Sequence, residues 1–151
     1  MKTLFIIVAV LIALAFIAIY VQNSRAPSLG HNQGSLKPLS GKPNAVSTQA
    51  EDVGLRVAPW SFKADQQATM AAIIEAVKGY GGAGIIKQEA DYLYVVFTTD
   101  LMKFHDDAEF YLDTDTKEVH FRSASRAGYS DQGLNRRRYE RLTTLYQQTQ
   151  G

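Results

Sequence analysis

Arginines gather near the carboxyl end of the chain, where their guanidinium groups could hold an anionic group. Residues 122–141 contain six arginines against Asp131 and Glu140, and no lysine follows Lys117. A guanidinium group offers a planar pair of donors that matches a carboxylate or a phosphate. This stretch is therefore the first candidate for a binding surface. Its arginines are Arg122, Arg126, Arg136, Arg137, Arg138 and Arg141.

Acidic residues upstream offer these arginines partners within the chain. Residues 89–118 hold nine acidic residues against two lysines. Because opposite charges on neighbouring strands attract, one interpretation is that the two stretches neutralise each other inside the fold, while the serines bond the backbone. The carboxylates that this interpretation assigns to the arginines are Asp106, Asp107, Glu109 and Asp131.

A second interpretation is a pocket for a carboxylate, phosphate or sulfate, lined by Ser125, Arg126 and Arg136. Three adjacent arginines early in a predicted helix oppose the helix dipole, which indicates that an anionic group compensates them. That group is either a carboxylate of the domain or a bound ligand such as a lipid headgroup. The predicted ligand-binding residues are Arg122, Ser123, Ser125, Arg126, Asp131, Asn135, Arg136 and Arg138.

Catalytic and metal-binding patterns are weaker. A small hydrolase would need His120 together with one of the acidic residues Asp106, Asp107 or Glu109. Glu109, however, is predicted to face Arg122, which would keep its carboxylate ionised and structural. A metal site is not predicted either, because Asp106 and Asp107 point to opposite sides of a strand. We therefore expect no metal, no cofactor, and binding rather than catalysis.

Alternating apolar and polar residues predict the strands that would position these groups. Residues 107–113 and 118–124 form a hairpin around a four-residue loop, with Phe110 opposite Phe121 on one face. On the other face, this register places Glu109 opposite Arg122 and Tyr111 opposite His120.

Two helices and a second hairpin complete the expected domain. Residues 65–78 carry an apolar stripe at helical spacing and are capped by Ser61 or Asp65, and residues 134–148 carry another stripe. Residues 84–89 and 92–99 predict the second hairpin. The glycines of GYGGAG follow a helix and precede a strand, so they are not a phosphate-binding loop. The expected fold is α+β, with an antiparallel sheet of about four strands and two helices on one face, preceded by a transmembrane helix.

The amino-terminal segment predicts a membrane anchor in residues 1–24. Its apolar run begins with Leu4, ends with Val21 and contains no charged residue. As a helix it would be about 27 Å long, close to the hydrocarbon thickness of a bilayer and longer than a typical signal-peptide core. Lys2 precedes the run, so the positive-inside rule favours a domain outside the cytoplasm, in the periplasm of a bacterium.

Between the anchor and the domain lies a segment rich in proline and glycine. Residues 25–54 predict either a flexible linker or an ordered strap over the sheet, and residues 55–151 the α+β domain. A strap would cover the tyrosines expected on the sheet face opposite the helices, which are Tyr92, Tyr94 and Tyr111.

The composition excludes several classes of protein. The chain has no cysteine, which excludes a disulfide scaffold and thiolate metal sites. Its net charge of +1 excludes a generally basic nucleic-acid binder. The expected partners are therefore the membrane and an anionic small molecule, a lipid headgroup or an envelope protein.

The run RSASRAGYSDQGLNRRRYE (residues 122–140) resembles a segment of domain-of-unknown-function family 1499, whose pattern is R-S-x-S-R-x-G-x-x-D-x-G-x-N-R-x-R. FHDDAEFYLD (104–113) is similar to the family's F-x-D-D-x-E-F segment, and the resemblance covers about residues 29–146. Many members carry cysteines at positions equivalent to Leu39 and Ala45, so a thiol role there is not essential. The resemblance implies no established activity. The residues themselves favour a membrane-anchored, non-catalytic binding domain; a small hydrolase and a purely structural envelope protein remain the alternatives.

Overall fold

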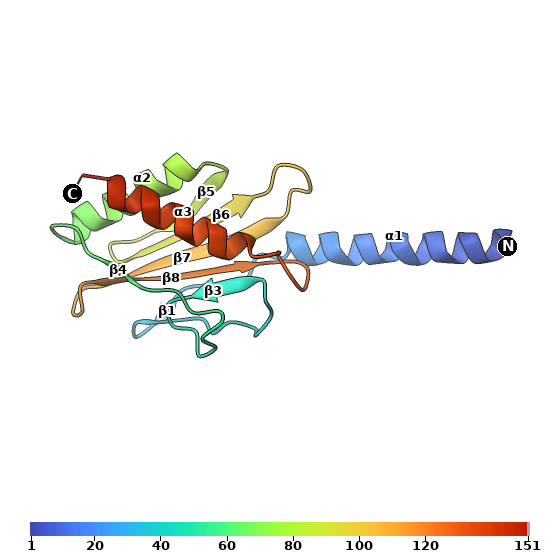
Figure 1. Ribbon diagram of the computed structural model, residues 1–151, viewed down its shortest axis with the longest axis horizontal. Coiled ribbons are helices and arrows are strands. Elements are labelled where there is room, and N and C mark those ends of the chain that lie inside the picture. The colour runs from blue at the N-terminus through green and yellow to red at the C-terminus, as the bar shows by residue number, and fades with distance from the viewer. Residues whose placement is uncertain (151) are drawn as a thin grey trace.

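The apolar run near the amino terminus forms one helix, α1 (Lys2–Ser24), in the computed structural model, which describes residues 1–150. The helix is long and apolar enough to cross a membrane, and none of its apolar window is buried against the chain. A signal sequence has the same properties, so length and composition alone do not distinguish the two. Figure 1 shows α1 leaving one end of the domain.

The domain is built on an antiparallel sheet of six strands, in place of the predicted four or so. The order is β3-β8-β7-β6-β5, and β4 also pairs with β8. The additional strands are β3 and β4, of three and two residues, which are too short to display an alternating pattern. The strands are β3 (Ala45–Ser47), β4 (Trp60–Ser61), β5 (Ala83–Gln88), β6 (Tyr92–Thr98), β7 (His105–Asp113) and β8 (Glu118–Ser125).

The β7–β8 hairpin has the predicted register. Phe110 lies opposite Phe121, and both side chains are fully buried on the face that carries the core. On the reverse face, Glu109 lies opposite Arg122 and Tyr111 lies opposite His120. The β5–β6 hairpin is also confirmed, with a shift in register between Ile85 and Lys87 that the sequence did not indicate.

Helices α2 (Gln66–Tyr80) and α3 (Leu134–Gln148) cover one face of this sheet, as predicted (Figure 1). Asp65, rather than Ser61, caps α2, because its carboxylate accepts a hydrogen bond from the backbone N–H of Ala68 at 2.8 Å. Gly81 ends the helix with a φ of 83°, a conformation that favours glycine, and the chain then enters β5.

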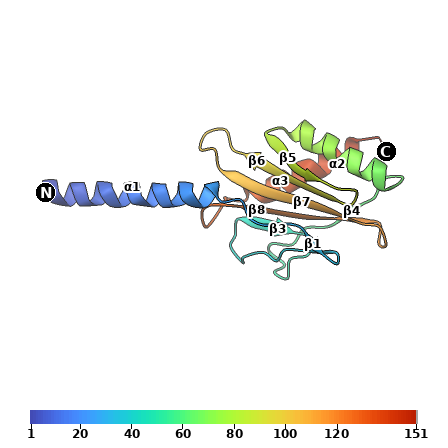
Figure 2. The ribbon, with the colours of Figure 1, turned by 180° about the vertical axis from the view of Figure 1, so that it is seen from behind.

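The segment between α1 and β3 lies on the opposite face of the sheet (Figure 2). It contains a short hairpin, β1 (His31–Asn32) and β2 (Ser35–Leu36). The buried Leu36 packs in a cluster with Tyr92, Tyr94 and Val96 of β6. The sheet is therefore enclosed by helices on one side and by this segment on the other, and polar groups of both faces are withdrawn from water.

Candidate functional site

Three arginines of the carboxyl-terminal stretch form buried ion pairs with carboxylates of β7. Arg122 contacts Glu109 at 3.2 Å, Arg126 contacts Asp107 at 2.8 Å, and Arg138 contacts Asp106 at 2.6 Å. The structure thus confirms the predicted pairing of arginines with these three carboxylates. Because successive side chains of a strand point to opposite faces, the pairs are divided between the two sides of the sheet.

The helix-side pair belongs to a buried hydrogen-bond network, in which only the Arg138 Nε atom lacks a partner among residues 1–150. Arg138 of α3 donates to Asp106 and to the Oδ1 atom of Asn135, which also accepts a hydrogen bond from the hydroxyl of Ser123. The Asn135 amide donates to the carbonyl of Asn44 and to Ser125. The side chains of Ser123 and Asn135 are fully buried, so this part of the predicted site ties α3 to the sheet and is closed to a ligand.

Asp131 supports the start of α3 and contacts none of the arginines by an ion pair. Its carboxylate accepts from the backbone N–H groups of Gly133 and Asn135, at 2.9 and 2.7 Å, and also from the Asn135 side chain. These are donors that a helix leaves unsatisfied in its first turn. Asp131 therefore holds the turn that leads into α3, whose N-cap residue is Gly133, and the predicted pairing of Asp131 with an arginine is not observed among residues 1–150.

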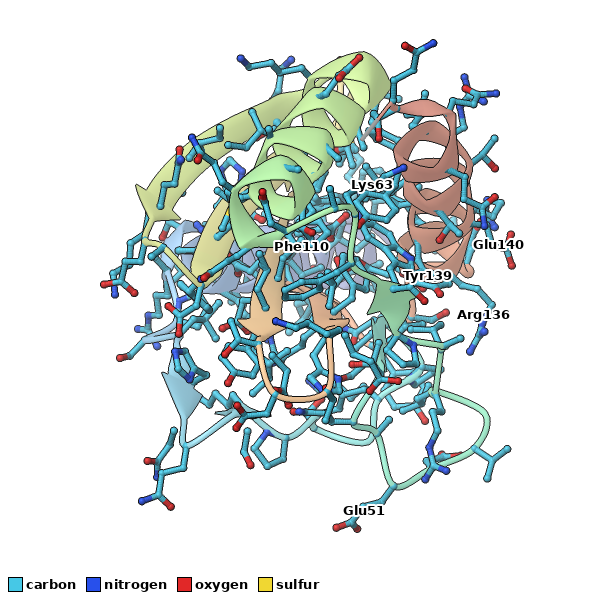
Figure 3. All side chains as sticks on the ribbon, turned by 90° about the vertical axis from the view of Figure 1, so that its left-hand side faces the viewer. Glu51, Lys63, Phe110, Arg136, Tyr139 and Glu140 are labelled. Carbon is cyan, nitrogen blue, oxygen red and sulfur yellow. The ribbon has the colours of Figure 1, made fainter. Side chains whose placement is uncertain are left out.

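The remaining arginines of the run form no ion pair within residues 1–150. Arg136 donates to the backbone carbonyl of Gly54 at 2.7 Å, and Arg137 donates to that of Gln132 at 2.7 Å. In Figure 3, Tyr139 points from α3 into the core, whereas Arg136 and Glu140 point away from it. The structure therefore does not bring Arg136 together with Arg126, as a shared pocket would require.

On the other face of the sheet, Arg122 and Arg126 are each held by strong hydrogen bonds. Arg122 donates through Nε to the carbonyl of Lys37 at 2.8 Å and through Nη1 to Glu109. Arg126 donates through Nε and Nη2 to Asp107, and Nη2 also contacts the Tyr94 hydroxyl. Neither the Arg122 Nη2 atom nor the Arg126 Nη1 atom makes a hydrogen bond within residues 1–150, so each guanidinium keeps one free donor nitrogen.

The protonation of this cluster follows from burial. Burial and the hydrogen bond to Asp107 raise the pKa of Tyr94 to about 12, so the tyrosine remains a donor. The hydrogen bond to Asp107 also raises the pKa of Arg126, which stays cationic. Burial raises the pKa of Glu109, while donors from Tyr92 and Arg122 oppose the rise. Arg126 is thus fixed in position and charge, whereas burial outweighs the effect of Arg122 on the pKa of Glu109, contrary to the prediction that Arg122 keeps this carboxylate ionised.

A cavity of about 400 Å³ opens beside these two arginines. Five of its lining side chains are cationic, and one, Asp107, is a carboxylate. Three of the cations form no ion pair within the part of the chain that the structure describes. A surplus of positive charge next to preorganised guanidinium donors is the arrangement that binds a carboxylate or a phosphate. The unpaired cations are Arg25, Lys37 and Lys42.

Sequence reasoning did not assign these three cations to the site. They lie in the segment between the anchor and the domain, far along the chain from the arginine-rich run. The sequence does contain a feature that indicates their role: the first 50 residues contain four cationic side chains and no acidic side chain. Such a segment has no local partner for its charges, so a surface built from it stays positive.

The residues considered for hydrolysis are engaged elsewhere. The Nδ1 atom of His120 lies 3.2 Å from the Thr48 hydroxyl, and its ring stacks on Tyr111 at 6.2 Å between centroids. Asp107 and Glu109 are occupied by arginines. In the range 1–150, no three His, Asp or Glu side chains gather as a metal site would need. The side chains that a hydrolase of this kind would use are therefore already hydrogen-bonded or ion-paired within the fold.

Comparison with known proteins yields one similarity. Residues 35–145 match the model of a family described as "Protein of unknown function (DUF1499)". The match covers the six-stranded sheet, α2, the arginine-rich run and α3 up to residue 145. No curated protein and no solved structure matches the chain.

Proposed function

Because the chain belongs to the DUF1499 family of proteins of unknown function, we propose its role from its own geometry: it is a membrane-anchored, non-catalytic domain that holds an anionic group in the cavity beside Arg122 and Arg126. The observation that supports this proposal is the set of unpaired cations, Arg25, Lys37 and Lys42, around the buried Arg122 and the largely buried Arg126, whose guanidinium groups are held in position.

The charge balance of the cavity supports an anion rather than a neutral ligand. Asp107 is already bound by two nitrogens of Arg126, so its charge is compensated before any ligand arrives. Glu109 lies behind Arg122 and accepts a hydrogen bond from its Nη1 atom at 3.2 Å. The lysines and Arg25 then leave a net positive surface, and the free Arg122 Nη2 and Arg126 Nη1 atoms supply directed donors. A phosphate, sulfate or carboxylate group has the matching charge and acceptors.

The position of the cavity allows two sources of such a group. Its lining includes Gln22 and Arg25, at the end of α1, so it lies next to the segment that would leave a bilayer. A phospholipid headgroup and a soluble anion share the chemistry that the cavity would recognise. The anchor itself is part of the proposal, which rests on the length, apolarity and exposure of α1.

Neutralising the two lysines is expected to weaken anion binding about tenfold, since each partly exposed charge contributes roughly 0.5–1 kcal/mol. The measurement is calorimetric titration of inorganic phosphate into the full chain in nanodiscs of neutral phosphatidylcholine. The variant is Lys37→Gln with Lys42→Gln. Lys78→Gln is the matched control, because Lys78 is exposed on α2 and lies outside the cavity.

A second arm separates the two sources of the anion. The full chain is extracted from vesicles of mixed phosphatidylcholine and phosphatidylglycerol, and the bound lipids are counted by native mass spectrometry. Phosphate binding in neutral nanodiscs that the double variant weakens supports a soluble anion. Retention of phosphatidylglycerol that the double variant loses supports a headgroup. If neither probe binds, or if Lys78→Gln has an equal effect, the binding proposal is wrong and a structural role replaces it.

The proposed location is outside the cytoplasm, because Lys2 precedes the span. The cysteine-free sequence allows a direct test with Asp115→Cys at the exposed tip of the β7–β8 hairpin. We expect this cysteine to react with a membrane-impermeant maleimide added to intact cells. Reaction only after lysis would place the domain in the cytoplasm.

A further inference from the structure

The last turn of α1 is fastened to the connection between β6 and β7. The Asn23 side chain, only 5% exposed, donates to the carbonyl of Lys103 at 2.9 Å and accepts from the backbone N–H of His105 at 2.8 Å. The Tyr20 hydroxyl lies 3.4 Å from the carbonyl of Met102. The buried Asn23 amide thus donates to and accepts from the backbone of the domain, which fixes the end of α1. The direction of α1 therefore sets the orientation of the domain.

This attachment also sets the depth of the connection relative to a bilayer. The apolar run of α1 ends at Val21, and residues 20–24 would therefore lie at the interface between hydrocarbon and water. Because residues 102–105 contact Tyr20 and Asn23 directly, they lie at the same level along the helix. The connection cannot be far from the lipid surface if α1 spans the bilayer.

Large apolar side chains are exposed at this level. Leu101 is 90% exposed in the β6–β7 connection, and Tyr129 is 71% exposed in the connection from β8 to α3. Both connections extend from the end of the sheet at which α1 arrives (Figures 1 and 2). The second is joined to the first where the backbone N–H of Arg126 donates to the carbonyl of His105 at 3.0 Å.

From this geometry we propose that the surface formed by Leu101 and Tyr129 rests in the headgroup region of the membrane that α1 spans. The proposal depends on the proposed anchor but not on anion binding. Leucine and tyrosine are residues that settle at this depth, tyrosine because its ring is apolar and its hydroxyl stays hydrated. The β6–β7 connection carries Asp100 and Lys103, whose charges cancel, so Leu101 can approach the headgroups without a net charge on its own connection.

A lipid surface is favoured over a protein partner because α1, which would span the bilayer, leaves the domain on this side. The domain would lie on the bilayer in one fixed orientation, with the tip of the β7–β8 hairpin directed away from the membrane. This orientation also places the mouth of the cationic cavity, which includes Gln22 and Arg25, beside the headgroups.

Single cysteines in this cysteine-free chain allow the depth to be measured. Leu101→Cys and Tyr129→Cys are each spin-labelled in the full chain, with one chain per phospholipid nanodisc. Power saturation in the presence of oxygen, or of a water-soluble nickel complex, reports the depth of each label. The controls are Ala13→Cys in the middle of α1 and Asp115→Cys at the far hairpin tip.

Labels at positions 101 and 129 are expected to favour oxygen over nickel relative to position 115, and position 13 is expected to be the deepest. Adding Asn23→Ala should move the label at 101 toward the aqueous value without changing the label at 13. Aqueous labels at 101 and 129, with a deep label at 13, overturn the docking and leave the anchor intact. An aqueous label at 13 overturns the anchor itself. Labels at 101 and 129 that are shielded from both relaxants indicate burial within the domain itself and also overturn the proposal.

Discussion

Replacing Arg138 by alanine is expected to lower the free energy of unfolding by about 3–5 kcal/mol, because it leaves a buried carboxylate without its partner. Arg138 and Asp106 are 3% and 2% exposed, and their side chains meet at 2.6 Å. The guanidinium also lies 4.6 Å from the ring centroid of Phe97, so the truncation removes packing as well as charge.

Two further variants separate charge from packing at Arg138. Arg137→Ala is the matched control, since Arg137 is the exposed neighbour that contacts only a backbone carbonyl at 2.7 Å, and we expect a change within about 0.5 kcal/mol. Asp106→Leu combined with Arg138→Met should recover most of the loss, because no uncompensated charge stays buried. Denaturant unfolding of the full chain in detergent measures all three. A loss in Arg138→Ala no larger than that in Arg137→Ala would contradict the assignment.

Replacing Trp60 by alanine is expected to cost about 3–5 kcal/mol of stability, because it empties the junction between the sheet and α3. Trp60 is 5% exposed, and its ring stacks on Tyr146 with 4.7 Å between centroids and lies 5.6 Å from that of Phe110. Its indole N–H donates to the Thr143 hydroxyl at 2.9 Å. The side chain therefore joins β4, the sheet and the last helix.

Graded substitutions test whether the Trp60 ring fills this space. Trp60→Phe keeps an aromatic ring but loses the hydrogen bond to Thr143, so we expect a loss of about 1–2 kcal/mol. Val53→Ala should change stability by less than about 0.5 kcal/mol, because Val53 is 79% exposed. Far-UV circular dichroism during urea unfolding follows each variant without needing the tryptophan. Equal losses for Trp60→Phe and Trp60→Ala would show that the hydrogen bond, and not the ring, carries the effect.

The long strands and helices were predictable because the spacing of their apolar residues is typical of a strand or of a helix. The β7–β8 register followed from alternation alone, since a shift of one residue would have turned Phe110 and Phe121 to the wrong face. The pairing of Glu109 with Arg122 came from that register without further information. In contrast, β3 and β4 pair along β8 in three and two positions, and so few residues contain no period to detect.

The candidate site was only partly predictable for a related reason. The arginine-rich run is continuous in sequence, which suggested a single surface. It begins on a strand, however, and ends on a helix, so its side chains are divided among the two faces of the sheet and the solvent. Arg122 and Arg126 reach the cavity, Arg138 enters the core, and Arg136 turns outward.

The sequence by itself determined the properties that depend on neighbours along the chain: the apolar helix at the amino terminus, the four long strands and two helices, and the pairing of Glu109 with Arg122 across the β7–β8 hairpin. Only the tertiary structure decided which charges remain unpaired. It brings Lys37 and Lys42 beside strand residues more than 80 positions later, next to the end of α1. Such contacts depend on how segments far apart in the sequence pack across the sheet, which local sequence patterns do not indicate.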